Sequence, residues 1–591
     1  MKLTNKILTI ITLMLCVTGC SSFLEDEIQY TQEEVVTSSG IRSRGLIEDI
    51  YTDYSFRYFT DFSAEYLTDN GVLNSSETNF ANNNWGVAES HPYNYVWQQS
   101  YDNLRQIYQY IDLIHDTGLP YLPSPEILSV DISDRTVTRY YGEAFFLKAW
   151  AEWELLKTYG GESQDGTMLG FPIVNEILEN EAYASLSRNT YQECVDQIMA
   201  DLDVAIANLP VHYNVSTIPD NPSTPNINES NLGFTNLETG RASGLAAYAL
   251  KAKISLFAAS PAFNPTNDLT KWELAAQYAH DFIEFNGGLK SLAKFNVANE
   301  NNSNHIWRMR NSRNENSLEN RLYPPSLYGQ GEVNPSQNLV DAFPAANGYP
   351  ITETQSLYDA TTPYESRDAR FYRYIFYNGD QGFETQTTTD FDPLEIYLGG
   401  ADNFGGFIAN EGTRTGYYLK KYLNNVEFDP SVDNRVSTLP RVYVQLDLSE
   451  MYLSYAEAVN EAYGIANNAP AGLNYSAKEV LAEVRERAGL SADPYLDFAA
   501  ADSDLFRTLL KNERRIELCF TGERFHDLRR WKDILNIEDV KGVKITKDES
   551  EAISYENIVV EKRGYTNKNL YLPIPYTQVI LNANLKQNTG W

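Results

Sequence analysis

Aromatic residues set among amide and charged side chains are the groups in this sequence whose spacing could bind a ligand. Trp85 directly follows Asn82-Asn83-Asn84. In Trp307-Arg-Met-Arg310, arginines occupy alternate positions after the tryptophan. A third segment, from Arg321 to Tyr328, holds two tyrosines around two prolines. Flat rings stack on the apolar C–H faces of sugars, whereas amide and guanidinium groups bind the hydroxyl rim. These segments therefore predict a carbohydrate-binding surface built from loops.

The predicted ligand-binding residues are Trp85, Tyr323, Tyr328 and Trp307. Packing against the rest of the protein is the alternative for each ring, because aromatic side chains are commonly buried. For Trp307, which precedes alternating arginines, packing is the favoured interpretation. The tryptophans that fall within predicted helices are expected in the core: Trp97, Trp150, Trp153 and Trp531.

No catalytic or metal-binding set of residues stands out. The six histidines include no pair at metal-ligand spacing and no His-Glu-x-x-His motif. The sequence also lacks a Gly-x-Ser-x-Gly elbow and a phosphate-binding glycine loop. We therefore expect no enzyme, no cofactor and no metal. Acidic residues are abundant, so a glycosidase-like carboxylate pair, and with it a secreted hydrolase, stays open as an alternative.

The first nineteen residues predict a secretion signal that ends just before Cys20. Lys2 and Lys6 provide a positive start, Ile7–Val17 are mostly apolar, and Val17-Thr-Gly-Cys20 resembles a bacterial lipobox. This apolar stretch is too short for the about 20 residues of a spanning helix. Residues 1–19 are thus a predicted signal peptide, and Cys20 is the predicted lipid attachment site at the start of a tether to residue 40. An ordinary signal peptide, cleaved elsewhere, is the alternative.

Composition excludes some functions. The formal net charge is -33, which argues against a nucleic-acid partner, because phosphate binding needs a basic surface. With 42% hydrophobic residues over 591 positions the chain can bury a large core. After processing, only Cys194 and Cys519 remain as thiols, and we expect both to be buried and unpaired.

Apolar residues recur at helical spacing along most of the chain and predict paired helices. Small residues at the helix crossings are typical of tetratricopeptide-like hairpins, although a period of about 34 residues is not maintained. The fold is therefore predicted to be mainly α, a tetratricopeptide-like helical-hairpin scaffold with long loop-rich insertions. The predicted helices cover residues 41–58, 93–116, 135–159, 190–209, 241–259, 271–285, 447–463, 476–488 and, as two helices, 502–535.

Residues 286–445 interrupt this pattern. They are rich in Asn, Gly, Pro and Tyr, with short β-like runs at Phe371–Tyr377 and Gly416–Tyr422. A loop-rich region of this length is usually functional or disordered, and its aromatic content argues against disorder. We interpret it as a ligand-facing insertion between two parts of the helical scaffold, at about 41–285 and 446–591.

The stretch Lys511–Trp531 predicts two consecutive helices, with Gly522 as a left-handed cap that ends the first. Charged residues of both signs lie between its apolar positions. We expect ion pairs shared between these helices and the chain packed on them, and hence a structural clasp. A charged face exposed to solvent is the alternative.

The same stretch resembles the signature of a known family. Asn512-Glu-Arg-Arg-Ile-Glu-Leu518 and Gly522-Glu-Arg-Phe-His-Asp-Leu-Arg-Arg-Trp531 are similar to motifs of the SusD/RagB family of outer-membrane nutrient-binding lipoproteins. The C-terminal segments Leu572–Pro575 and Asn582–Trp591 resemble that family's end. Weaker matches, in the family's order, lie at residues 142–150, 338–350 and 455–461.

The resemblance implies one SusD-like domain over residues 41–591 and a protein anchored to outer-membrane lipid through Cys20. It also implies that the protein is exposed at the cell surface, binds a nutrient oligosaccharide and passes it to a SusC-like TonB-dependent transporter. Peptide or glycopeptide capture is an alternative within the same architecture. A repeat adaptor, which would bind protein partners on a concave helical face, is an alternative of another class.

Overall fold

The computed structural model describes residues 47–51, 62–75, 77–83, 85–88, 91, 93–117, 130–178, 180–213, 240–294, 302–310, 317–382, 392–402, 412–423, 442–490 and 492–591. The lipobox, the tether and most of the predicted helix at 41–58 lie outside these residues, although 47–51 are helical. No helix in the described ranges has the length and apolar character needed to cross a membrane.

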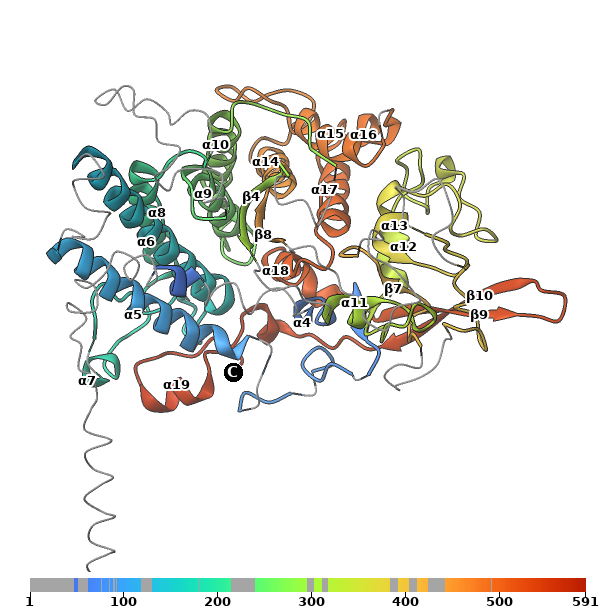
Figure 1. Cartoon of the computed structure of the whole chain (residues 1–591), viewed down its shortest axis with the longest axis horizontal. Helices are drawn as coiled ribbons and strands as arrows, with labels where there is room; N and C mark the ends of the chain where they lie inside the picture. Colours follow the sequence, from blue (N-terminus) through green and yellow to red (C-terminus); the bar gives the residue numbers. More distant parts are fainter. Residues whose placement is uncertain are drawn as a thin grey trace, which may run out of the picture.

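Long helices form a scaffold in which each helix packs on the next (Figure 1). The row runs from α5 through α6, α8, α9 and α10 to α14, which also contacts α15 and α17. The predicted helices at these positions are confirmed, with ends shifted by a few residues. Their bounds are α5 Asn94–Thr117, α6 Val130–Tyr159, α8 Tyr191–Asn208, α9 Gly244–Ala259, α10 Leu269–Phe285, α14 Leu448–Tyr463, α15 Ala477–Arg487 and α17 Ser503–Glu517.

Local sequence explains where these helices begin. Thr190 and Glu193 form a capping box at the start of α8, and Ser476 with Glu479 forms one at α15. These reciprocal hydrogen bonds satisfy backbone N–H groups that have no partner inside the helix. Helix α9 has almost no exposed residue, because neighbouring helices surround it.

The loop-rich region has a hydrophobic core of its own, centred on residues such as Tyr323, Phe343 and Tyr417. The expected strand at Phe371–Tyr377 is wrong in its first half, because the Asp368 side chain caps a helix there by accepting the Arg370 N–H. The short helices of this region and of the scaffold are α4 Ser63–Tyr66, α7 Asn180–Tyr183, α11 Ser317–Leu322, α12 Gln337–Ala342, α13 Ala369–Tyr374, α16 Pro494–Ala499 and α19 Tyr576–Leu581.

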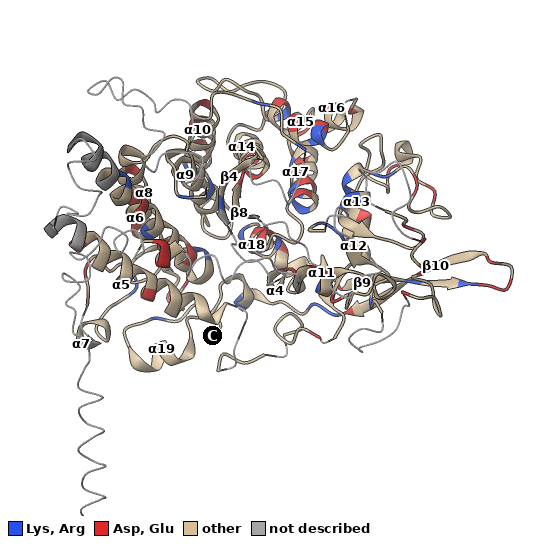
Figure 2. Ribbon diagram, in the orientation of Figure 1, with Lys and Arg blue, Asp and Glu red and all other residues tan. Residues whose placement is uncertain are grey.

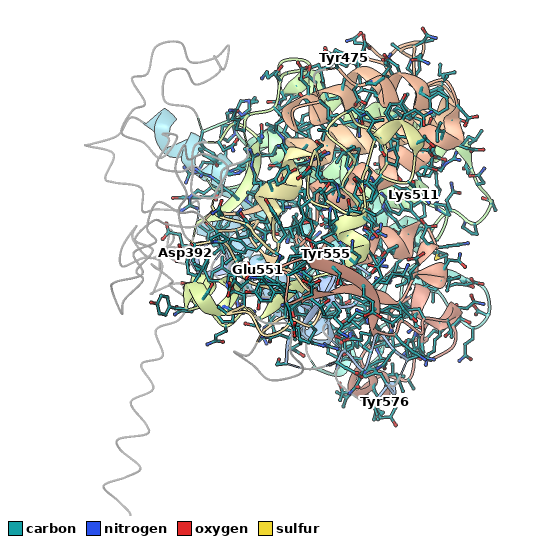
Figure 3. All side chains as sticks on the ribbon, turned by 90° about the vertical axis from the view of Figure 1, so that its right-hand side faces the viewer. Asp392, Tyr475, Lys511, Glu551, Tyr555 and Tyr576 are labelled. Carbon is teal, nitrogen blue, oxygen red and sulfur yellow. The ribbon has the colours of Figure 1, made fainter. Side chains whose placement is uncertain are left out.

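The described strands pair in five antiparallel two-stranded sheets, β1–β5, β2–β3, β4–β8, β6–β7 and β9–β10. The β9–β10 hairpin, which the helical periodicity did not predict, projects from the molecule, and Figure 3 labels Glu551 and Tyr555 on it. The strands are β1 Gly71–Leu73, β2 Gly161–Glu162, β3 Met168–Leu169, β4 His305–Arg310, β5 Val333–Pro335, β6 Ile375–Phe376, β7 Tyr418–Leu419, β8 Val442–Asp447, β9 Val540–Lys547 and β10 Ile553–Glu561.

The clasp joins the two cores. Ile516 near the end of α17 and Phe520 just after it belong to the core of the loop-rich region, whereas Phe525 on α18 (Glu523–Arg530) belongs to the scaffold core. Gly522 is left-handed, as predicted, but it precedes α18 instead of ending α17. The residue that turns the chain after α17 is Phe520, with a φ of +58°. The predicted free, buried state of Cys194 and Cys519 is confirmed.

Candidate functional site

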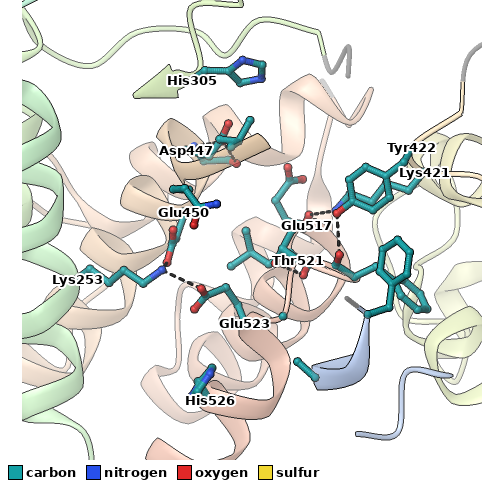
Figure 4. Close-up of a pocket in the computed structure, with 18 of the residues that line it drawn as sticks. Lys253, His305, Lys421, Tyr422, Asp447, Glu450, Glu517, Thr521, Glu523 and His526 are labelled. Carbon is teal, nitrogen blue, oxygen red and sulfur yellow. Dashed lines mark hydrogen bonds and ion pairs between the residues drawn. The ribbon is translucent and has the colours of Figure 1, made fainter. Parts of the chain in front are cut away.

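A pocket lies where the scaffold, the clasp and the loop-rich region meet, and we call it the central pocket (Figure 4). Its volume of about 210 Å³ exceeds the about 150 Å³ that accommodates a benzene ring in a protein cavity. Aromatic residues line both sides of it: Tyr93, Tyr95 and Trp150 on the scaffold side, and Phe62, Tyr422 and Phe520 on the other.

Helix α18 contributes to the pocket with its first turn and to the clasp with its second turn. Gly522, with a φ of +87°, starts the helix abruptly, in a left-handed conformation that other residues rarely adopt. Glu523 and His526, one helical turn apart, line the pocket. Asp527 and Arg530 instead face a buried ion network.

The ion network confirms the predicted clasp. Both terminal nitrogens of Arg530 donate to Glu457, at 2.6 and 2.7 Å, and its Nε donates to Asp527 at 2.7 Å. Asp527 also accepts from Arg514 at 3.0 and 3.1 Å. Figure 2 shows the two signs of charge side by side on α17 and α18. The solvent-exposed alternative is wrong, because these side chains are at most 6% exposed.

In the pocket, one lysine serves two carboxylates. Lys253 of α9 lies 2.8 Å from Glu450 of α14 and 2.8 Å from Glu523. Burial acts to raise the pKa of Glu523, but the nearby cations, Lys253 foremost, lower it to about 2, so that this carboxylate stays ionised. Burial raises the pKa of Glu450, although Lys253 acts against it.

Several polar atoms of the pocket wall have no hydrogen-bond partner among the described residues. They are Nδ1 of His526, Nε1 of Trp150 and Oε2 of Glu523. His526 and Trp150 are each 3% exposed. Burial, reinforced by Lys157, holds the pKa of His526 well below its usual value, so the ring is neutral at pH 7. Buried polar atoms are nearly always paired in folded proteins, so these unpaired ones call for a ligand or water.

Aromatic contacts hold the scaffold-side wall in place. The Tyr93 ring stacks on Phe525 at 5.7 Å with an 11° interplanar angle, and meets His526 edge-on at 5.4 Å. On the other side, Phe62 lies 5.8 Å from Tyr422 and 6.1 Å from Phe520. The pocket thus combines fixed ring edges and faces with unpaired donors and acceptors, which suits a ligand with both apolar faces and hydroxyl groups.

Metal and acid–base chemistry find less support. Within the described ranges, no group of three or more His, Cys, Asp or Glu side chains is placed to hold a metal ion. Glu450 and Glu523 are close enough to resemble a glycosidase pair, but the Lys253 ammonium contacts both of them.

Comparison with known proteins decides the family. Residues 293–591 match a model described as the SusD family, and residues 23–223 match one described as "Starch-binding associating with outer membrane". The first match alone covers half of the chain. The chain belongs to the SusD family. The predicted family is therefore confirmed, and the description of the second model names starch binding and association with the outer membrane.

Relatives of this SusD-family chain are distant. SusD-like protein P25 from Formosa agariphila is 25% identical over 419 residues, a match that covers 69% of this chain and 66% of that protein, just under two thirds. A SusD-like protein from Bacteroides fragilis NCTC 9343 superposes with a TM-score of 0.71 at 22% identity, covering 96% of this chain and 99% of that chain. A SusD-like carbohydrate binding protein from the same strain superposes with a TM-score of 0.68 at 18% identity, covering 93% of this chain and 100% of that chain. A laminarin binding SusD-like protein superposes with a TM-score of 0.58 at 19% identity, covering 93% of this chain and 99% of that chain. The predicted SusD-like fold is confirmed.

The predicted binding rings do not line the central pocket. The prediction is wrong for two of them, because their rings are buried. Trp307 is 1% exposed and packs edge-on between Phe146 and Trp150, at 4.8 and 4.6 Å. Tyr323 is 2% exposed in the core of the loop-rich region. Neither ring has a face on which a sugar could stack. For Trp307 the packing interpretation was right.

The other two rings are accessible. Trp85 is half-buried beside Trp591, with ring centroids 5.2 Å apart, and Tyr328 is 59% exposed in a left-handed turn. The pairing of β1 with β5 brings their two loops to the same small sheet, where the Asn74 side chain donates to the Gln330 carbonyl at 2.9 Å. As ligand contacts, Trp85 and Tyr328 stay predictions.

Sequence reasoning missed the pocket residues. Glu523 and His526 lie in the stretch that was interpreted as purely structural. Lys253 carried a usable signal, because a lysine on a helix as apolar as α9 needs buried carboxylate partners. Glu450 and Trp150 lie on other helices, and nothing in their local sequence indicates that they converge.

Proposed function

We propose that this chain is a lipid-anchored protein of the cell surface that captures an oligosaccharide and delivers it to a SusC-like TonB-dependent transporter. Membership of the SusD family supports the carbohydrate ligand. The observation that carries the proposal is the central pocket, where the rings of Tyr93, Tyr95 and Trp150 line the same cavity as the carboxylates of Glu450 and Glu523.

The ligand would extend from the pocket over the surface. We assign one sugar unit to the central pocket, because rings and unpaired polar atoms share that cavity. Tyr328, and Trp85 with it, would contact the rest of the chain of sugars, because Tyr328 exposes most of its ring. Stacking of these rings contributes about 25 cal/mol per Å² of apolar area before ordering costs.

The anchor would be the acylated Cys20 that follows the signal peptide at residues 1–19, with a tether to residue 40 and one SusD-like domain at 41–591. The lipobox Val17-Thr-Gly-Cys20 motivates this assignment. Cys20→Ala should release the protein from washed membranes that lack the transporter. Retention of that variant in the membrane fraction would contradict the anchor.

The chain would bind its glycan without cleaving it. Lys253 contacts both carboxylates of the candidate acid pair, so neither is left as an unhindered acid or nucleophile. Incubation of the purified protein with a bound oligosaccharide should produce no new reducing ends beyond a heat-inactivated control. Turnover above that control would favour the hydrolase alternative.

Titration calorimetry on the mature chain without its lipid tests the proposal directly. Oligosaccharides from laminarin and from starch are the first probes, because the comparisons include a laminarin binding protein and a starch-binding model. We expect saturable binding that is weakened about tenfold or more by Tyr93→Ala, as for a ring at a binding hot spot. Binding of peptides with no response to any glycan would favour the alternative ligand class.

A further inference from the structure

The inner end of the central pocket is built from five side chains on four helices: Trp150 of α6, Lys253 of α9, Glu450 of α14, and Glu523 and His526 of α18. Four of them are at least nine-tenths buried: Trp150, Lys253, Glu450 and His526. Figure 4 shows Lys253, Glu450, Glu523 and His526 around the same space. Their positions are fixed by helices and not by loops, which favours a preorganised site.

The unpaired atoms at this end include both a donor and an acceptor. The Trp150 indole N–H can only donate, and the Glu523 carboxylate can only accept. The indole N–H and the Oε2 atom of Glu523 have no hydrogen-bond partner within the described part of the chain, although Oε1 of Glu523 accepts from Lys253. A hydroxyl group can accept from the indole and donate to the carboxylate. An ammonium group cannot accept, and an ionised carboxylate or sulfate cannot donate.

The charges at this end disfavour an anion. Lys253 is shared by the two carboxylates of Glu450 and Glu523, and Lys157 pairs with Glu154 at 2.7 Å. The other cations of the pocket wall are also engaged: Lys421 donates to the carbonyl oxygens of Glu517 and Cys519, and Arg487 pairs with the Glu517 carboxylate. A bound anion would therefore meet acidic groups without gaining an uncommitted cation.

From this geometry we propose that the inner end of the central pocket binds an uncharged, hydroxyl-rich sugar unit and rejects sugars that carry a carboxylate or a sulfate. The inference rests on the proposed function and adds the class of glycan. The ligand is thus a neutral oligosaccharide, one sugar unit of which enters the pocket. The rim of the pocket includes Val444, which is 37% exposed, so the remaining units can reach solvent.

Matched ligands test this assignment. A neutral laminarin oligosaccharide and its sulfated form are titrated into the lipid-free mature chain. We expect the sulfated form to bind at least about tenfold more weakly, because like charges in a poorly solvated site are costly. Equal affinities for the two forms would overturn the inference but leave the proposed function standing. Absence of binding to either form, or to any other neutral glycan, would count against both.

Two variants locate the effect. Glu523→Gln keeps the size of the side chain but removes its charge. It should reduce the ratio of the affinities for the neutral and the sulfated oligosaccharide from about tenfold to about threefold or less. Trp150→Phe keeps an aromatic ring but removes the N–H donor, and should lower the affinity for the neutral oligosaccharide about fivefold. Glu556→Gln, at a side chain that is 71% exposed on β10, is the matched control. It should change neither the affinity for the neutral oligosaccharide nor the ratio of the two affinities.

If Glu523→Gln fails to fold, Glu450→Gln makes the same test of charge. Thermal melting of each variant shows whether the fold is retained. Discrimination that is unchanged in every folded pocket variant would overturn the inference.

Discussion

The two turns of helix α18 differ in how their charged and polar side chains are paired. In the second turn, Arg530 and Asp527 lie in a network in which every nitrogen of Arg530 that can donate has an acceptor: Glu457, Asp527 or the Ser260 hydroxyl. In the first turn, Glu523 and His526 keep unpaired atoms at the wall of a cavity. The same eight-residue helix thus holds a completed network and an incomplete one.

The difference separates structure from binding. A buried ionic network is stable only when each member is paired, because an uncompensated charge in a poorly solvated interior is costly. An incomplete network is tolerated where a ligand or water can complete it. The same contrast appears among the aromatic rings, since Tyr323 is buried and Tyr328, five positions further on, is exposed.

The strongest test of this comparison removes a member of the completed network. Arg530→Ala leaves Glu457 buried without the arginine that binds both of its oxygens and removes one of the two arginines paired with Asp527. It should lower the free energy of unfolding by about 3–5 kcal/mol. Chemical denaturation measures it. Arg507→Ala removes an arginine whose side chain is 36% exposed, and should cost less than about 1 kcal/mol. Similar losses at both positions would remove the distinction.

The two tyrosines of one loop extend the comparison to rings. Tyr323→Ala empties part of the core of the loop-rich region and should cost about 3 kcal/mol. Tyr328→Ala removes a ring that is mostly in solvent and should cost less than about 0.5 kcal/mol. Melting and denaturant curves measure both. A large loss at Tyr328 would show that its ring is part of the fold and not a binding surface.

The pocket-lining turn of α18 should respond to pH through His526. Its pKa is lowered by burial, so the unfolded chain binds a proton near pH 6.5 that the folded chain does not. Stability is therefore lost as the pH falls through this range. Compared with His526→Gln, the wild type should lose about 2 kcal/mol between pH 7 and pH 5. Parallel pH profiles would mean that His526 titrates normally and faces solvent.

Among the buried charged groups of α18, the smaller effect on stability is expected at Glu523. In Glu523→Gln, Lys253 keeps Glu450 as its counter-ion, so the free energy of unfolding should change by only about 1 kcal/mol. The contrast with Arg530→Ala is the point of the experiment, because both residues lie on one helix. A loss as large as that of Arg530→Ala would place Glu523 in the clasp and not in a binding pocket.

Much of the fold could be predicted from local patterns. Apolar spacing located the long helices, since a helix that packs along one side must place apolar residues every three or four positions. Opposite charges interleaved with apolar residues in 511–531 predicted the clasp. The β9–β10 hairpin was missed: β10 is largely exposed, and the buried residues of β9, Val540, Gly542, Val543 and Ile545, do not follow helical spacing.

The binding site was decided by tertiary structure. The sequence alone determined the family and the kind of chemistry, rings beside hydrogen-bonding groups, because these depend on residue types. It could not show that Trp307 is covered by Phe146 and Trp150, or that Lys253 meets Glu523 from 270 positions away. Burial and convergence depend on how distant helices pack, and no local pattern records that. Only the packed structure separates a ring that fills a core from one that can meet a sugar.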